Sequence, residues 1–307
     1  RLAQPAQPPG EPFRMPEQLT LPIRLGVALQ VDRIEIESVA EDATSSTQVI
    51  EALRAHYRYD DVHHALRIDS VAWGRSRLQA STRLEARTLD LEADIAASLR
   101  DLAPQMPFAM LLHAGAAGSL QGGDAAQLQV ELDAREQSAD AADPDPATLL
   151  ESLQALRTTL EDDAGADASV AQLFARATLH PWRAQPIAQA RLRATRLNAG
   201  VFHASLPQTR IEAAVDVLPV QNAAESWDLI AGLRNALPGP WDAQRLPLSA
   251  VDARARLAPE GLHLDNAQLQ LAGDAGVQLA GDLPREGLDA AHFTLQLAQV
   301  DLKQLMS

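Results

Sequence analysis

The stretch LHLDNAQLQLAGDAGVQLAGDL, residues 262–283, decides how the rest of this sequence is interpreted. Leucine or valine recurs at every second position on both sides of the turn signal GDAG, residues 273–276, and mostly polar residues stand between them. Successive side chains on a strand point to opposite faces of a sheet, so each half has one apolar and one polar face. The pattern predicts a β-hairpin, and it raises the question of what covers the apolar face.

The same alternation recurs along most of the chain. Apolar residues alternate with polar ones in segments that fall within residues 25–36, 84–95, 128–132, 211–217, 251–257 and 293–302. A change of phase between Asp32 and Arg33 is typical of a β-bulge. The stretch IEALRAHYRYD, residues 50–60, fits a helix or a strand, and its neighbours favour a strand. Short period-two segments separated by turn residues predict an antiparallel all-β protein.

Three regions depart from the alternation. Residues 1–22 contain six prolines and are interpreted as an extended leader or linker, followed by a β-segment over 23–137. Residues 138–169 form an acidic insertion, in which leucines at helical spacing predict one short helix, and a second β-segment covers 170–307. A further short helix is predicted at 225–237, where Pro238, Gly239 and Pro240 close it.

Composition limits the classes of function. The chain has 307 residues, a net charge of −15 and a pI near 4.9, which excludes nucleic acid and anionic membrane surfaces as expected partners. It has no cysteine, so disulfides and thiolate sites are excluded. There is no apolar run of transmembrane length, and because the chain begins with Arg1 we expect an anchor or targeting segment to precede it.

The residues that could take part in catalysis or metal binding do not form a recognisable site. His63 and His64 lie near His56 and Asp60, but adjacent residues on a strand point to opposite faces, and no HExxH spacing is present. The glycine-rich stretch 115–124 lacks the GK[ST] of a phosphate-binding loop, so we interpret it as a turn or bulge. No GxSxG motif occurs. We therefore expect no catalytic residue, no metal site, no cofactor and no enzymatic activity.

Two motifs are not explained by alternation. They are HPW followed by QP, at residues 180–182 and 185–186, and GPWD followed by RLPL, at residues 239–242 and 245–248. Together with residues 16–38 they resemble the TamB proteins, periplasmic subunits of the translocation and assembly module that are related to the AsmA-like and bridge-like lipid-transfer proteins. The resemblance covers nearly the whole chain except the acidic insertion.

The resemblance implies a fold and a cellular setting. TamB-like proteins have an inner-membrane anchor helix, which would lie outside this chain, and a long periplasmic body. That body is a curled antiparallel sheet, U-shaped in section (a β-taco), with an apolar groove along it. The family is linked to the passage of phospholipid towards the outer membrane. It is also linked to outer-membrane protein assembly with TamA, an outer-membrane barrel that would contact parts of the protein outside this chain.

Two functions and one alternative architecture remain open. The apolar face offers a groove to phospholipid acyl chains, or the sheet is a scaffold whose edges pair with client strands during outer-membrane protein assembly. Alternatively, a second sheet covers the face, as in an ordinary sandwich. We interpret Trp182 and Trp241 as packing anchors at loop corners. The residues predicted to line a lipid groove are Val27, Leu29, Val31, Leu89, Leu91, Leu128, Val130, Ile211, Val215, Val251, Leu262, Leu264, Leu269, Leu271, Val277, Leu279, Leu295 and Leu297.

Overall fold

The structure is a computed structural model that describes residues 17–39, 45–100, 109–137, 170–201, 205–272, 275–285 and 290–298. These residues form fifteen strands and three short 3-10 turns. The strands are β1 (Leu25–Val39), β2 (Ser45–Tyr59), β3 (His63–Trp73), β4 (Ser76–Glu85), β5 (Asp90–Leu99), β6 (Ala109–Ser119), β7 (Gln127–Gln137), β8 (Gln172–Leu179), β9 (Ile187–Leu197), β10 (Ile211–Pro219), β11 (Trp227–Asn235), β12 (Leu248–Ala258), β13 (Gly261–Leu271), β14 (Gly276–Pro284) and β15 (His292–Ala298). The 3-10 turns are η1 (Gly123–Ala125), η2 (Ala199–Val201) and η3 (Trp241–Ala243).

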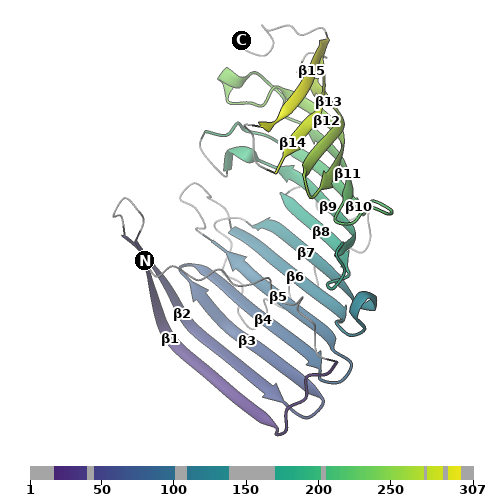
Figure 1. The fold of residues 1–307 in the computed structure, drawn as a ribbon. Helices are drawn as coiled ribbons and strands as arrows, with labels where there is room; N and C mark the ends of the chain where they lie inside the picture. The colour runs from purple at the N-terminus through teal and green to yellow at the C-terminus, as the bar shows by residue number, and fades with distance from the viewer. Residues whose placement is uncertain are drawn as a thin grey trace.

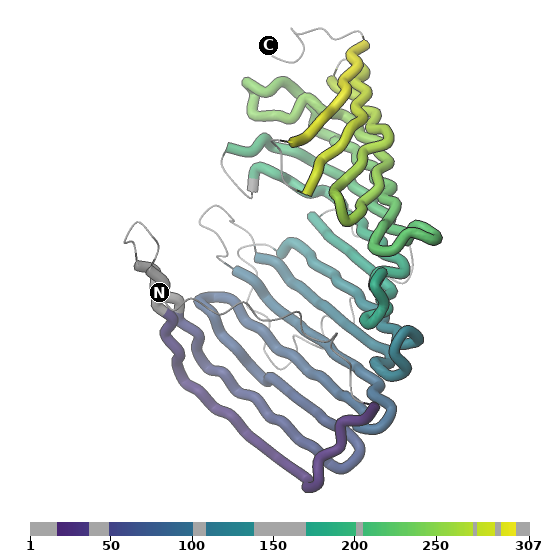
Figure 2. The backbone as a smooth tube through the Cα atoms, in the orientation of Figure 1, coloured from purple at the N-terminus to yellow at the C-terminus, as the bar shows by residue number. Residues whose placement is uncertain are grey.

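All fifteen strands belong to one antiparallel sheet in which each strand pairs with the next one in the sequence. The order runs from β1 to β15, and these two strands are the edges (Figure 1). The last strands are turned steeply relative to the first, as expected when the twist between neighbouring strands accumulates (Figures 1 and 2). The prediction of an all-β protein built from a long curled antiparallel sheet is confirmed.

Bulges adjust the phase of the alternation along single strands. In β3 the register with β4 shifts by one residue between Ile68 and Val71, and in β13 the register with β14 shifts between Leu264 and Ala267. A change of phase was expected beside Asp32 on β1. The register of β1 with β2 is the same before and after this residue, and Ala52 on β2 has a positive φ of 53°. Because a bulge adds one residue to one strand, apolar residues three positions apart face the same side.

Two of the strand predictions are confirmed. The quoted stretch is the antiparallel hairpin of β13 and β14, in which Leu269 pairs with Val277. The ambiguous stretch 50–60 belongs to β2. The leader prediction is only partly within the described residues: residues 17–24 contain no strand, and the Leu19 N–H donates to the Ala86 carbonyl at 2.8 Å.

The helix predicted at 225–237 is wrong. These residues contain β11, which pairs with β10 and β12 over its length. Trp227, Leu229, Ala231 and Leu233 recur at every second position, although Ile230 interrupts the polar side of the pattern, and two flanking strands supply the hydrogen bonds that a helix would have made internally. The short helix predicted in the acidic insertion lies outside the described residues.

The most buried apolar side chains are small. Of the buried apolar residues in the described part of the chain, all but Tyr59, Leu89 and Val277 are alanines. Large apolar side chains, by contrast, stay half exposed: Leu29 is 50% and Leu295 is 55% exposed. In a sandwich the large side chains of two inner faces interdigitate and become the most buried. The described strands therefore form a single layer and not the sandwich that was the alternative.

Gly118 lies on β6 where the backbones of β6 and β7 approach each other closely, and a substitution at this position tests that contact. Its φ is 145°, and a Cβ at this position would lie 2.1 Å from the carbonyl oxygen of Gln127 on β7. We expect Gly118→Ala to lower the free energy of unfolding by about 1–3 kcal/mol, measured by chemical denaturation. Gly26→Ala is the matched control, because nothing lies within 4 Å of its Cβ. Equal effects of the two substitutions would show that the β6–β7 contact is not constrained.

Candidate functional site

An unbroken row of apolar residues crosses the whole sheet. Directly opposed residues of antiparallel strands place their side chains on the same face, and each member of this row is opposed to the next. We call it the central row: Leu29, Ala55, Ile68, Ala80, Ile95, Ala114, Leu132, Ala175, Leu192, Val215, Ala231, Ala253, Ala267, Leu279 and Leu295. Every strand contributes one residue, and none is polar.

Two further rows flank the central row. The first crosses β3 to β15 through Val71, Leu78, Ala97, Leu112, Ala134, Leu173, Ala194, Ala213, Leu233, Val251, Leu269, Val277 and Leu297. The second crosses all strands through Val27, Tyr57, Leu66, Thr82, Ala93, Ala116, Val130, Ala177, Ala190, Val217, Leu229, Ala255, Leu264, Gly281 and Phe293. We call the three rows together the apolar face. At about 4.8 Å between strands, it extends roughly 65–70 Å across the sheet.

The apolar face is not flat. Large and small residues alternate from strand to strand over β1 to β9 of the central row, as in Ile95, Ala114 and Leu132. Over β7 to β10 this alternation leaves a hollow of ≈ 280 Å³. Its side chains on the apolar face are all apolar: Val130, Leu132, Ala175, Ala177, Ala190, Leu192, Val215 and Val217. The alanines lie between branched residues, so the hollow has a low floor and raised sides.

The opposite face carries cross-strand ion pairs. Arg193 lies 3.1 Å from Asp216, Arg256 lies 2.9 Å from Asp228, and the pairs involve half-exposed side chains. Exposed pairs of this kind contribute at most about 1 kcal/mol each, so they are not the main source of stability. They show instead that charged residues of opposite sign gather on this face, whereas over β5 to β7 the same face buries Ser98 and His113.

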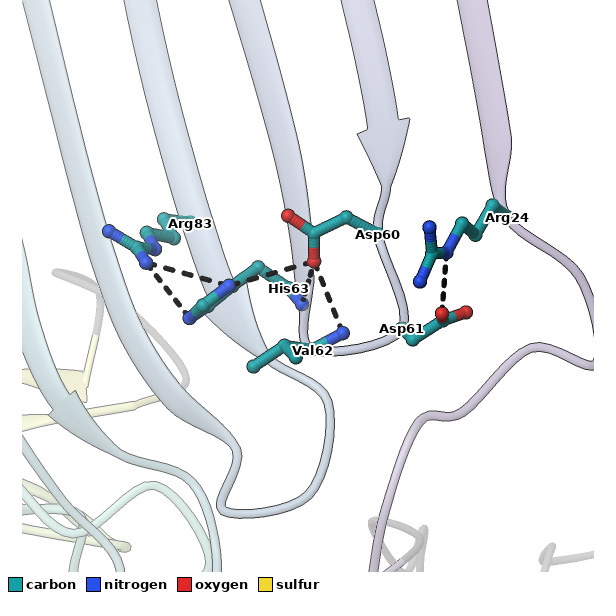
Figure 3. Close-up of polar contacts among 6 residues, drawn as sticks. All are labelled: Arg24, Asp60, Asp61, Val62, His63 and Arg83. Carbon is teal, nitrogen blue, oxygen red and sulfur yellow. Dashed lines mark hydrogen bonds and ion pairs between the residues drawn. The ribbon is translucent and has the colours of Figure 1, made fainter.

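The histidine cluster illustrates the separation of the two faces. On the polar face, Asp60 accepts hydrogen bonds from the backbone N–H groups of His63 at 2.8 Å and Val62 at 3.1 Å, which lower the pKa of Asp60, while the His63 ring lies 2.9 Å from Arg83 (Figure 3). His64 instead contacts the hydroxyl of Tyr57 at 2.6 Å, across the sheet from His63. Within the described residues, no three histidines or carboxylates are placed to hold a metal.

The register places the predicted groove residues in the rows of the apolar face or on the same side of the sheet just beyond these rows, with one exception. Leu89 precedes β5, has a φ of 53° in a turn, and is fully buried beneath the strand ends, where its carbonyl accepts the Leu120 N–H. The prediction that Leu89 shares the face of Leu91 is therefore wrong, because the strand begins one residue later. Whether the other residues contact lipid stays a prediction.

Sequence reasoning missed the alanines of the face. Ala175, Ala177 and Ala190 line the hollow; the signals that could have found them are the period-two alternations of QLFARATL, residues 172–179, for the first two and of IAQARLRATRL, residues 187–197, for Ala190. Alanine is too common in this chain to stand out by composition.

The two tryptophans predicted as packing anchors behave differently. Trp182 in the β8–β9 loop donates its Nε1–H to the Leu120 carbonyl at 2.9 Å, which ties two neighbouring loops together and confirms its role. Trp241 in η3 is 54% exposed, so the prediction for it is wrong. The tight backbone turn at Pro240–Gln244, held by its own carbonyl hydrogen bonds, closes this loop without burying the indole.

Comparisons with known proteins give no relative. No family model, no curated protein and no solved structure matches the chain. In the described part of the chain, no helix has the length and apolar character needed to span a membrane. The fold and the site define the class of protein as an open, single-layer, amphipathic β-meander with one continuous apolar face. What that face contacts is a matter for proposal.

Asp133, on the polar face of β7, gives a pH-dependent test of the fold. Burial raises the pKa of Asp133 above its usual range, and Arg135 at 3.4 Å opposes the shift only in part. The folded protein then binds more protons than the unfolded one at pH values above the unfolded pKa of 3.8, so stability falls as pH rises through the folded pKa and stays lower at neutral pH. We expect Asp133→Asn to raise the melting temperature at pH 7 and to match the wild type near pH 3.

The melting temperature is followed by circular dichroism between pH 3 and 7. Asp242→Asn, in the exposed turn η3, serves as the control and should not change the pH profile. A profile for Asp133→Asn parallel to that of the wild type at every pH would contradict the assignment.

Proposed function

We propose that this chain is a periplasmic segment of a TamB-like protein, tethered to the inner membrane by a helix outside the chain, and that its apolar face carries phospholipid acyl chains towards the outer membrane. The observation that carries the proposal is the central row, which is apolar on every strand from Leu29 to Leu295. The resemblance of the motifs at residues 180–186 and 239–248 to TamB proteins is what supports the proposed family and compartment.

The size of the face supports an apolar ligand. Three rows spaced by two residues span about 20 Å along the strands, so the face covers on the order of 1,000 Å². Contiguous apolar patches on monomeric soluble proteins rarely exceed about 300–600 Å², and larger ones mark binding surfaces. The half-exposed Val27, Leu29, Leu295 and Leu297 show that this area is open at both ends of the sheet. A ligand with a long apolar chain covers this exposed apolar area.

The chemistry of the face suits passage. Its rows carry no carboxylate, amine, guanidinium or imidazole, so an acyl chain gains about 0.8 kcal/mol for each buried CH₂ without being fixed at one place. The only polar groups in the rows are the hydroxyls of Thr82 and Tyr57, both uncharged. A chain held only by apolar contact shifts along the face by exchanging one set of equivalent contacts for another.

A photocross-linking experiment on strand β14 tests the proposal. Benzoylphenylalanine is placed at Leu279 on the apolar face or at Gln278 on the polar face, and the protein is expressed in a Gram-negative periplasm. We expect phospholipid adducts at position 279 and none at position 278, read by mass spectrometry. Leu269→Asp, one strand away on the same face, should reduce the yield at position 279 severalfold, whereas Gln268→Asp should leave it unchanged.

Equal cross-linking at positions 278 and 279 would contradict the proposal, as would purified wild-type protein that retains no lipid in native mass spectrometry. A lipid-free protein would instead favour the scaffold function, in which the edge strands β1 and β15 pair with strands of an outer-membrane protein client. A client pull-down that survives Leu269→Asp distinguishes that alternative.

A further inference from the structure

A second, amphipathic pocket lies at one end of the apolar face, where the hairpins of β11 to β14 turn. Its volume is ≈ 500 Å³, larger than that of the hollow over β7 to β10. We call it the rim pocket. It is lined by Ala184, Glu225, Trp227, Leu257, Ala258, Pro259, Gly261, Leu262, Leu283, Pro284 and Arg285.

The floor of the rim pocket is continuous with the apolar face. Trp227 opposes Leu257, Leu257 opposes Leu262, and Leu262 opposes Leu283, so these four side chains form one more apolar row. The next row along the same strands, which begins at Leu229, belongs to the apolar face. An apolar chain that starts in the rim pocket therefore continues onto the face without crossing a polar residue.

Several contacts fix the shape of the rim pocket. The Trp227 Nε1–H donates to the Ile187 carbonyl at 3.0 Å, which holds the indole in place, and the Arg285 N–H donates to the Glu260 carbonyl at 2.9 Å. Gly261 has a φ of 148°, and a Cβ there would lie 2.3 Å from the Leu283 carbonyl oxygen. The backbone of β13 and β14 thus approaches more closely here than any other residue would allow.

Two residues of opposite charge, Glu225 and Arg285, line the rim pocket. Glu225 and Arg285 are both exposed, and neither forms an ion pair with any residue that the structure describes. On the polar face of the same strands, by contrast, Arg256 pairs with Asp228 and Arg234 pairs with Asp252. A cation and an anion above an apolar floor are complementary to a ligand that has an anion, a cation and an apolar body.

We infer that the rim pocket binds the headgroup of a zwitterionic glycerophospholipid, with the phosphate at Arg285, a primary ammonium at Glu225 and the acyl chains on the row from Trp227 to Leu283. This inference rests on the proposed function and adds a headgroup preference to it. Guanidinium groups match phosphate oxygens in geometry and charge, and a carboxylate is acceptor-only and suits an ammonium donor. A phospholipid whose headgroup lacks an ammonium offers no cationic donor to the Glu225 carboxylate.

Short-chain lipids allow the headgroup to be tested on the purified chain. Dihexanoyl phosphatidylethanolamine and dihexanoyl phosphatidylglycerol are titrated separately, and binding is followed by tryptophan fluorescence and native mass spectrometry. We expect the wild type to prefer the ethanolamine lipid by about fivefold. Arg285→Gln should weaken both lipids by about tenfold, because both contain the phosphate. Glu225→Gln should abolish the preference and leave the glycerol lipid unaffected.

Controls separate the headgroup site from the acyl-chain site. Arg87→Gln, an exposed arginine in the β4–β5 turn outside the pocket, should change neither affinity, and melting temperatures establish that all variants fold. Lipid binding that neither Arg285→Gln nor Glu225→Gln alters would overturn the headgroup site while leaving the proposed function intact. A wild type that binds neither lipid would overturn both. Glycerophosphoethanolamine, the headgroup without chains, should fail to compete, and competition at equal concentration would overturn a lipid ligand.

Discussion

The strand register is the constraint on which the rest of this structure depends. In a sheet with a side-chain period of two, a slip of one residue moves every side chain of a strand to the opposite face. With fifteen strands paired in sequence order, a slip at one pair affects more than that pair, because the face on which a strand places its apolar residues depends on its register with the strand before. The bulges in β3 and β13 correct the phase within a strand, so that Ile68 and Val71, like Leu264 and Ala267, stay on one face. Without these corrections Val71 would face away from Ile68, and Ala267 would face away from Leu264.

The register also explains why a single layer is sufficient. With no opposing sheet among the described strands, stability comes from the hydrogen-bonded ladders and from lateral contacts between directly opposed side chains. Where large and small residues alternate, a small side chain stands directly between two larger ones, as Ala114 does between Ile95 and Leu132. Alanine becomes the buried residue and leucine the half-exposed one, the reverse of a sandwich core. A face built in this way stays available to an occupant.

The sequence alone predicted the fold class because alternation is a local signal with a direct physical cause. It predicted which face of β13 and β14 is apolar, and the register confirmed this pairing through Leu269 and Val277. It failed where two local interpretations were equivalent. Residues 225–237 satisfied both a helical and a strand spacing, and only the flanking strands β10 and β12 decide between them. The rim pocket was out of reach for another reason, since Glu225 and Arg285 are sixty positions apart and only the topology brings them to one pocket.

The direction of the rows has a mechanical consequence for an acyl chain. The rows run perpendicular to the strands, so movement along the length of the sheet means stepping from strand to strand. Each step along the central row exchanges one apolar contact for another, from Leu132 to Ala175 to Leu192, and no step requires a methylene group to lie against a charge. Glu225 and Arg285, which have no ion-pair partner among the described residues, line the rim pocket beside the rows and not within them. Along the rows themselves an apolar chain stays in uniform surroundings, which is the condition for a nearly level free-energy profile across the sheet, whereas the rim pocket is a local site at the hairpins of β11 to β14.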